Sequence, residues 1–218
     1  MTAAGTAGAD GLRVLPVGRH GLLVELRTAE AAEAFHAELL RRRAGGGLPP
    51  VREIVPGART VLLEGLDEPA LLAARLPHWV VPPLTPGREA AVEIPVRYDG
   101  PDLEQVARLW RVPAEEVARV HAATEFRVAF CGFAPGFGYL TGLPEEYHVP
   151  RRTSPRTKVP AGAVALAGAY TGVYPRSSPG GWQLIGSAPH TVLWDPERSP
   201  AALLAPGTRV RFVPEESR

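Results

Sequence analysis

The sequence predicts an α+β fold in which a small α/β sandwich is followed by a closed β-barrel. Three observations predict it. The 24 prolines and 23 glycines are spread between apolar segments, which is typical of short strands joined by defined turns. Strand and helix patterns alternate in the first third of the chain. From residue 126 onward there are only short apolar runs, about ten residues apart, and this spacing favours a barrel over βαβ units.

The first domain is predicted over residues 12–82, after a disordered start at residues 1–11. "LRVLPV" and "LLVEL" are strand-like runs on either side of a glycine-centred turn. Thr28 is a suitable N-cap for a helix in "TAEAAEAFHAELLRRRA", which the glycines at 45–47 end. "VREIVP" and "RTVLLEGL" are two further strands, and "EPALLAARLPHWV" is a second helix. This order predicts a small open-sheet sandwich.

The second domain is predicted over residues 88–218, after a proline-rich linker at 81–87. It begins with the strand "AVEIPVRY" and two adjacent helices, "PDLEQVARLW" and "PAEEVARVHAAT". The barrel strands that follow are expected in "FRVAFC", "AVALAG", "TGVYP", "WQLIG", "HTVLWD" and "RVRFVP".

Composition excludes several functional classes. The formal net charge of +1 gives no global field that would attract nucleic acid or a membrane. The helix pair has the length of a helix-turn-helix, but Glu115 and Glu116 begin the second helix, where DNA phosphates would repel them. The single cysteine, Cys131, excludes an internal disulfide and a cysteine-based metal site. No leader and no membrane-length apolar stretch is recognised, so we expect a cytoplasmic protein.

The loop "GFAPGFG" is the first candidate for function. It lacks the Lys-Ser/Thr of a P-loop, and its glycines do not fit the dinucleotide fingerprint. Gly136 frees the backbone, Phe133 and Phe137 supply apolar walls, and Pro135 stiffens the turn. Such a loop can donate amides to an anionic oxygen, and it can equally be a tight barrel corner.

The segment "PRRTSPRTKVPAG" is the second candidate, because it places Arg151, Arg152, Arg156 and Lys158 close together without an acid. Extended geometry would bring Arg152, Arg156 and Lys158 to one side. Arginine grips carboxylate or phosphate through two hydrogen bonds, and lysine acts as a point charge. The alternative is a solvated basic hairpin. The prolines favour anion binding, because they stiffen the segment and reduce the entropy cost of presenting its charges.

Two further places bear polar chemistry. In "RSSPGGWQLIG" the serines precede a proline and have no lysine nearby, so a nucleophile there is a weak reading. Trp182 and Gln183 are better candidates, as a flat apolar face beside an amide. His121 lies four residues after Val117, on the apolar stripe of its helix, where a core role and a proton-transfer role both remain open.

Four long motifs in order resemble one family: "GFAPGFGYLTGLPEEYHVPRR", "SPRTKVPAGAVALAGAYTGVYP", "SPGGWQLIGSAP" and "LWDPERSPAALLAPGTRVRF". They are similar to the B-subunit family of 5-oxoprolinase, also called allophanate hydrolase subunit 1 or the sporulation-kinase inhibitor family. "PVGRHGLLVEL" and "VREIVPGARTVLL" extend the resemblance back to about residue 12. The chain departs from the family at Gly138-Tyr139, at Ala169-Tyr170 and at Ser187, which puts details of substrate contact in doubt.

The resemblance implies a cyclophilin-like barrel and a subunit of an ATP-dependent 5-oxoprolinase, which opens the lactam 5-oxoproline to glutamate. It also implies two partners, a sister barrel subunit and a third subunit, with ATP and Mg²⁺ at a subunit interface and no metal site in this chain. His121 and Lys158 are the catalytic candidates. The substrate-binding candidates are Phe133, Pro135, Gly136, Phe137, Arg151, Arg152, Arg156, Thr171, Tyr174, Gly180, Gly181, Trp182 and Gln183.

Two alternatives remain within the resemblance. One is a regulatory inhibitor of a sensor histidine kinase, which would use the barrel surface as its contact. The other is a subunit of an allophanate or urea amidolyase-type carboxyltransferase.

Overall fold

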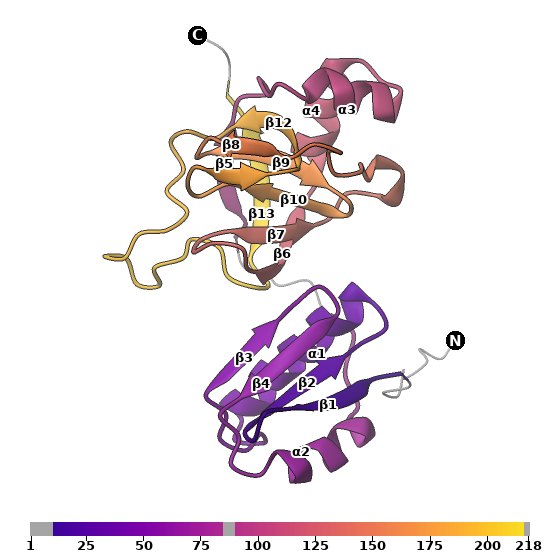
Figure 1. Cartoon of the computed structure of the whole chain (residues 1–218), viewed down its shortest axis with the longest axis vertical. Helices are drawn as coiled ribbons and strands as arrows, with labels where there is room; N and C mark the ends of the chain where they lie inside the picture. Colours follow the sequence, from indigo (N-terminus) through magenta and orange to yellow (C-terminus); the bar gives the residue numbers. More distant parts are fainter. Residues whose placement is uncertain (1–10, 85–89, 216–218) are drawn as a thin grey trace. The chain divides into compact units, whose positions relative to one another are not determined.

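The computed structural model describes residues 11–84 and 90–215, and the chain divides into two compact units between residues 88 and 89 (Figure 1). The expected disordered start at 1–11 lies outside the described residues except for Gly11, and so does part of the expected linker at 81–87. Each unit has a hydrophobic core of its own.

The first unit is a four-stranded antiparallel sheet in the order β1-β2-β4-β3 with helices packed against it. Thr28 caps the first helix as predicted, since its Oγ1 accepts a hydrogen bond from the Ala31 amide at 3.1 Å. The strand and helix order also matches the prediction. The elements are β1 (Arg13–Val17), β2 (Gly21–Glu25), α1 (Ala29–Ala44), β3 (Glu53–Pro56), β4 (Thr60–Glu64), α2 (Pro69–Arg75) and the short 3₁₀ helix η1 (Leu76–His78).

The core of this unit follows from strand alternation. Leu22 and Val24 of β2, and Val61 and Leu63 of β4, are buried, while the residues between them are less so. Helix α1 packs against β3 and β4 and contributes Phe35 to the same core. The unit therefore buries one face of its sheet under the helices.

The second unit is a seven-stranded sheet in the order β12-β9-β10-β7-β6-β13-β5. An antiparallel bridge between Arg97, which follows β5, and Ser187, the last residue of β12, links the two edges of the sheet, so the sheet is a nearly closed barrel. A two-stranded sheet, β8-β11, accompanies it. The elements are β5 (Val92–Val96), α3 (Leu103–Trp110), α4 (Ala114–Ala123), β6 (Phe126–Cys131), β7 (Gly138–Thr141), η2 (Glu145–Tyr147), β8 (Arg156–Val159), β9 (Ala163–Ala167), β10 (Tyr170–Val173), β11 (Ser178–Gly180), β12 (Gln183–Ser187) and β13 (Arg209–Pro214).

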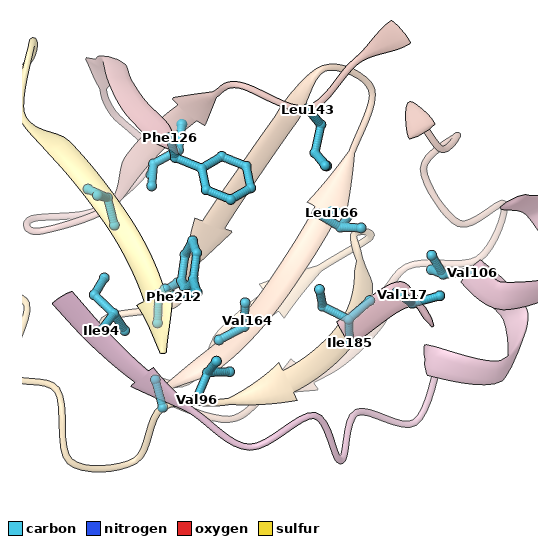
Figure 2. Packing of buried hydrophobic residues seen from close by; sticks show 14 of the residues in the cluster. Ile94, Val96, Val106, Val117, Phe126, Leu143, Val164, Leu166, Ile185 and Phe212 are labelled. Carbon is cyan, nitrogen blue, oxygen red and sulfur yellow. The ribbon is translucent and has the colours of Figure 1, made fainter. Parts of the chain in front are cut away.

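The barrel core joins strands that are far apart in sequence. Figure 2 shows Ile94, Phe126 and Phe212 from three different strands packed together, with Val106 and Val117 entering from the two helices. The helix pair contacts β12 and β13, so it is part of the barrel domain, as expected, and shares its core.

One predicted strand of the barrel unit is absent, and three observed strands were not predicted. The segment "HTVLWD" is not a strand: within it only Trp194 forms an isolated bridge, to Ala202. The segment pairs only briefly with residues 201–203: Leu203 N donates to the Leu193 carbonyl at 2.9 Å, and Asp195 N donates to the Ala201 carbonyl at 3.0 Å. The Val192 carbonyl instead accepts from Arg198 Nη1 at 3.2 Å, so the pairing does not extend into a strand. Conversely, β7 was missed because it begins inside the glycine loop. The paired strands β8 and β11 were also missed, because both lie in segments rich in proline.

Candidate functional site

The glycine loop connects β6 to β7 and closes on itself. The amide of Gly132 donates to the Phe137 carbonyl at 3.2 Å, and the amide of Phe137 donates to the Ala134 carbonyl at 3.0 Å. The amides of Phe133 and Gly136 make no hydrogen bond within the described residues. Both of these residues have positive φ, 64° and 82°. The loop is therefore a tight corner that leaves two amides unpaired.

Phe133 is the unusual residue of this loop. A bulky side chain rarely adopts positive φ, because its Cβ approaches the backbone carbonyl. The side chain is nevertheless 57% exposed, so burial of its ring does not compensate for the strain. Strained and exposed residues of this kind cluster at binding sites.

The aromatic residues behind the loop form a small core of their own. Phe137, Tyr174 and Trp182 are buried, and the ring of Phe137 lies 5.4 Å from Tyr174 and 5.5 Å from Trp182. A Cβ on Gly180 would lie 2.4 Å from the Tyr174 hydroxyl, so only glycine allows this approach. The buried rings of the predicted site are thus packing elements, and Phe133 lies at their exposed edge.

A buried carboxylate, Asp102, organises the basic segment. Its Oδ1 accepts hydrogen bonds from Arg152 Nη1 at 2.7 Å and Arg156 Nη2 at 2.8 Å. Its Oδ2 accepts from Arg156 Nη1 at 2.8 Å and from the Leu184 amide at 2.7 Å. From the sequence these arginines were expected to bind an external anion, whereas in the structure both bind the internal carboxylate of Asp102. Arg156 uses both terminal nitrogens on Asp102, and Arg152 uses only one.

The charge of Asp102 is maintained against its burial. Burial raises the pKa of Asp102, but the hydrogen bonds from Arg156 and the Leu184 amide and the charges of both arginines outweigh it. The pKa therefore lies below its ordinary value of 3.8, and Asp102 is ionised at neutral pH.

Backbone contacts bring Asp102 to this position. The chain before α3 runs along β12, with Asp102 N donating to the Leu184 carbonyl at 2.9 Å. A Cβ on Gly100 would lie 2.3 Å from that same carbonyl oxygen, so glycine permits the approach. Asp102 occupies the N-cap position of α3 without making a side-chain cap bond. Sequence reasoning missed it, because an aspartate before a helix is explained by capping alone.

Tyr174 links the glycine loop to the basic segment. Its ring lies 6.0 Å from that of Phe133. Burial raises the pKa of Tyr174, and the positive charges of Arg151 and Arg156 act in the opposite direction. Arg151 and Lys158 are exposed and form no ion pair among the described residues. The structure therefore brings the two candidate segments together and leaves two exposed cations beside them.

His121 and Thr171 lie inside the barrel. Both side chains have no exposed surface, and His121 Nε2 is 3.3 Å from Thr171 Oγ1 while Nδ1 is 2.9 Å from the Tyr98 hydroxyl. Burial lowers the pKa of His121 to about 3, so the ring is neutral. Neither side chain can reach a dissolved substrate in this conformation. The structure therefore argues against the proton-transfer role expected for His121 and the substrate contact expected for Thr171.

Three buried polar atoms near the basic segment have no hydrogen-bond partner: Arg152 Nε, Ser178 Oγ and Gln183 Oε1. Gln183 donates its Nε2 to the Pro150 carbonyl at 3.2 Å, which fixes the direction of its amide. Buried polar groups without partners are rare and call for an explanation.

Neither metal binding nor a reactive cysteine is supported by the described residues. The parts of the chain that the structure describes contain no group of histidine, cysteine and carboxylate side chains suited to hold a metal ion. Cys131 Sγ donates to the Leu204 carbonyl at 3.5 Å, and burial raises the pKa of its thiol, so it is not an activated nucleophile. None of the helices in the described residues has the length and apolar character to cross a membrane.

A family model described as the carboxyltransferase domain, subdomain C and D, matches residues 12–204. The chain belongs to this family. Relatives from two bacteria are each named as the B subunit of 5-oxoprolinase. The Escherichia coli O157:H7 protein is 46% identical over 178 residues, which is 78% of this chain and 80% of that one. The Bacillus subtilis protein is 50% identical over 125 residues, 56% of this chain and 52% of that one.

Solved structures extend the comparison. The protein TTHA0988 is 36% identical with a TM-score of 0.72, and the match covers 91% of this chain but only 40% of that protein. The urea amidolyase of K. lactis shares the fold at 20% identity and a TM-score of 0.70, over 94% of this chain and 15% of the enzyme. The carboxyltransferase-family fold of this chain thus recurs as one part of longer chains.

Proposed function

We propose that this chain is a subunit of an ATP-dependent 5-oxoprolinase that works with partner subunits in the cytoplasm. The observation that carries the proposal is the 46% identity to a protein named as the B subunit of 5-oxoprolinase, over 80% of that protein's length. The site supports it, since a strained loop with two unpaired amides lies beside a segment rich in arginine.

In the proposed reaction, the lactam carbonyl oxygen accepts the terminal phosphoryl group of ATP, and ADP leaves. Water then opens the activated ring, which gives glutamate and inorganic phosphate. ATP, as its Mg²⁺ complex at a subunit interface, supplies the phosphoryl group. Arg151 and Lys158 hold the phosphoryl group, because both are exposed and neither is neutralised by an ion pair among the described residues. The amides of Phe133 and Gly136 donate to the negative charge that develops on oxygen.

The partner subunits complete the site. The chain has no P-loop, and its described residues offer no metal-binding group, so the partners provide the remaining contacts to ATP and Mg²⁺. A sister barrel subunit and a third subunit are the partners we propose. His121 is left out of this mechanism, because its ring is neutral and enclosed.

The test is reconstitution. The chain is purified with the sister and third subunits, and 5-oxoproline-dependent ATP hydrolysis is measured with each component omitted in turn. We expect activity only with all three. Hydrolysis by the chain alone would contradict the dependence on partners. A stable complex without turnover would contradict the enzymatic proposal and favour a regulatory role.

A further inference from the structure

Asp102 gives its two arginines different roles. Arg156 is held at both terminal nitrogens, at 2.8 Å each, so its charge is used within the protein. Arg152 contributes only Nη1, and no other nitrogen of its guanidinium has a partner among the described residues. Since the guanidinium is planar and rigid, fixing Nη1 also fixes the direction of the edge formed by Nε and Nη2. That edge can still donate two parallel hydrogen bonds.

Gln183 offers the complementary group on the neighbouring segment. The two segments are tied together, because the Arg152 amide donates to the Gly181 carbonyl at 2.8 Å and Gln183 Nε2 donates to the Pro150 carbonyl. Turning the Gln183 amide over would place its oxygen against that carbonyl, so Oε1 must remain the atom without a partner. Gln183 is 5% exposed, and this atom is fully buried.

Unpaired buried groups are costly to retain. Each has lost its hydrogen bonds to water and gained none from the protein. A donor edge and an acceptor lie here on two adjoining segments, beside the exposed Arg151 and Lys158. The Arg152 side chain as a whole is 32% exposed, whereas its Nε and Gln183 Oε1 are buried, so these two atoms lie just below the surface of the barrel unit. A ligand with the opposite pattern would satisfy both groups at once.

We infer that Arg152 and Gln183 form a specificity subsite that recognises a carboxylate next to a ring N–H, with Asp102 as the residue that positions Arg152. This inference rests on the proposed function. In a lactam amino acid, one carbon separates the carboxylate from the ring nitrogen. The carboxylate accepts two hydrogen bonds from the Nε–Nη2 edge of Arg152, and the ring N–H donates to Gln183 Oε1.

The experiment compares three compounds in the assembled enzyme: 5-oxoproline, 2-pyrrolidinone, which lacks the carboxylate, and N-methyl-5-oxoproline, which lacks the N–H. For the wild type we expect kcat/KM for each analogue to be at least about 10-fold lower than for 5-oxoproline, because a site built to hydrogen-bond a group rejects the compound that lacks it. If either analogue is used as well as 5-oxoproline, the subsite is refuted without any variant.

Two variants then test which side chain recognises which group of the substrate. In Gln183→Met the preference for 5-oxoproline over the N-methyl compound should fall to about 1, while the preference over 2-pyrrolidinone is kept. In Arg152→Lys the preference over 2-pyrrolidinone should fall about 10-fold or more, and the N–H preference should be kept. A purely structural role would lower all three rates together. Arg176→Gln, at an exposed arginine in the neighbouring loop, is the matched control and should leave both preferences unchanged.

The outcomes separate the two proposals. If the wild-type complex does not turn over 5-oxoproline, both the enzymatic function and the subsite are refuted. If it does, and the variants keep both preferences, the subsite alone is refuted. If Gln183→Met fails to fold, the comparison of the three compounds in the wild type and in Arg152→Lys still tests whether the subsite exists.

Discussion

Replacing Asp102 by asparagine should strongly destabilise the barrel unit. The change keeps the shape of the side chain but removes its charge and replaces one acceptor oxygen by a donor. Asp102 accepts three hydrogen bonds from the two arginines and one from the Leu184 amide. In Asp102→Asn the new NH₂ group would face N–H donors, and two guanidinium groups would lose their counter-charge.

The size of the effect follows from the burial of the three groups. Breaking a buried ion pair by removing one partner costs about 3–5 kcal/mol, because the other charge stays buried without compensation. The Asp102 side chain is 4% exposed, but those of Arg152 and Arg156 are 32% and 23% exposed, so water screens part of the loss. We therefore expect the free energy of unfolding to fall by about 3 kcal/mol, at the lower end of that range.

Urea denaturation at a series of pH values measures this. The lowered pKa of Asp102 means that its contribution is fully present above about pH 4, the region of its ordinary pKa of 3.8, and is lost as the pH falls through the folded-state pKa. The difference between wild type and Asp102→Asn should accordingly be largest near pH 7 and shrink in acid. Hydrogen exchange in the four-stranded unit, which lies outside this network, is the internal control. A loss below about 1 kcal/mol at pH 7, or a difference that does not change with pH, would refute the reasoning.

Three further results are expected. The free energy of unfolding of the wild type should fall as the pH drops from 6.5 toward 3, because the fold disfavours protonated His121; this residue contributes up to about 1.4 kcal/mol per pH unit. In urea titrations of His121→Phe this part of the pH dependence should disappear. An unchanged pH dependence would contradict the role given to His121. Gly180→Ala should lower the free energy of unfolding by about 1–3 kcal/mol, since its Cβ would lie 2.4 Å from the Tyr174 hydroxyl, whereas Gly181→Ala, with its nearest contact at 3.6 Å, is the matched control. Phe133→Gly should raise the melting temperature by relieving the positive φ, while lowering the turnover of the assembled enzyme; a lower melting temperature would contradict the assignment of strain.

The sequence was sufficient for the architecture, because its signals are local. Thr28, the glycines after α1 and the alternation of β2 and β4 each act over a few residues, and the two-part α+β fold was predicted from them. The burial of His121 follows equally from its spacing to Val117. Contacts between residues far apart in the sequence could not be predicted from such local signals. Asp102 meets Arg152 from 50 positions away, and Arg198 occupies the Val192 carbonyl, which a strand would otherwise use. Neither contact has a signature in the residues around it.

The sequence predicted which segments form the candidate site, but not which side chains in them are available to a ligand. The sequence analysis grouped the glycine loop and the basic segment, and Tyr174 does link them. It could not distinguish Phe133, which is exposed, from Phe137, which is buried, because both stand in the same glycine-rich pattern. Only the packing of the chain separates a side chain available to a ligand from one that supports it.

The pairing of β5 with β13 also constrains how the protein is made. The first strand of the barrel unit lies parallel to the last, with Val92 opposite Val210 and Val96 opposite Pro214. While the chain is being synthesised, β5 leaves the ribosome long before its partner exists. The barrel sheet cannot be completed until β13 has been synthesised, and Ile94 must wait for Phe212. The nascent apolar strands of this unit are therefore expected to require protection until β13 is available.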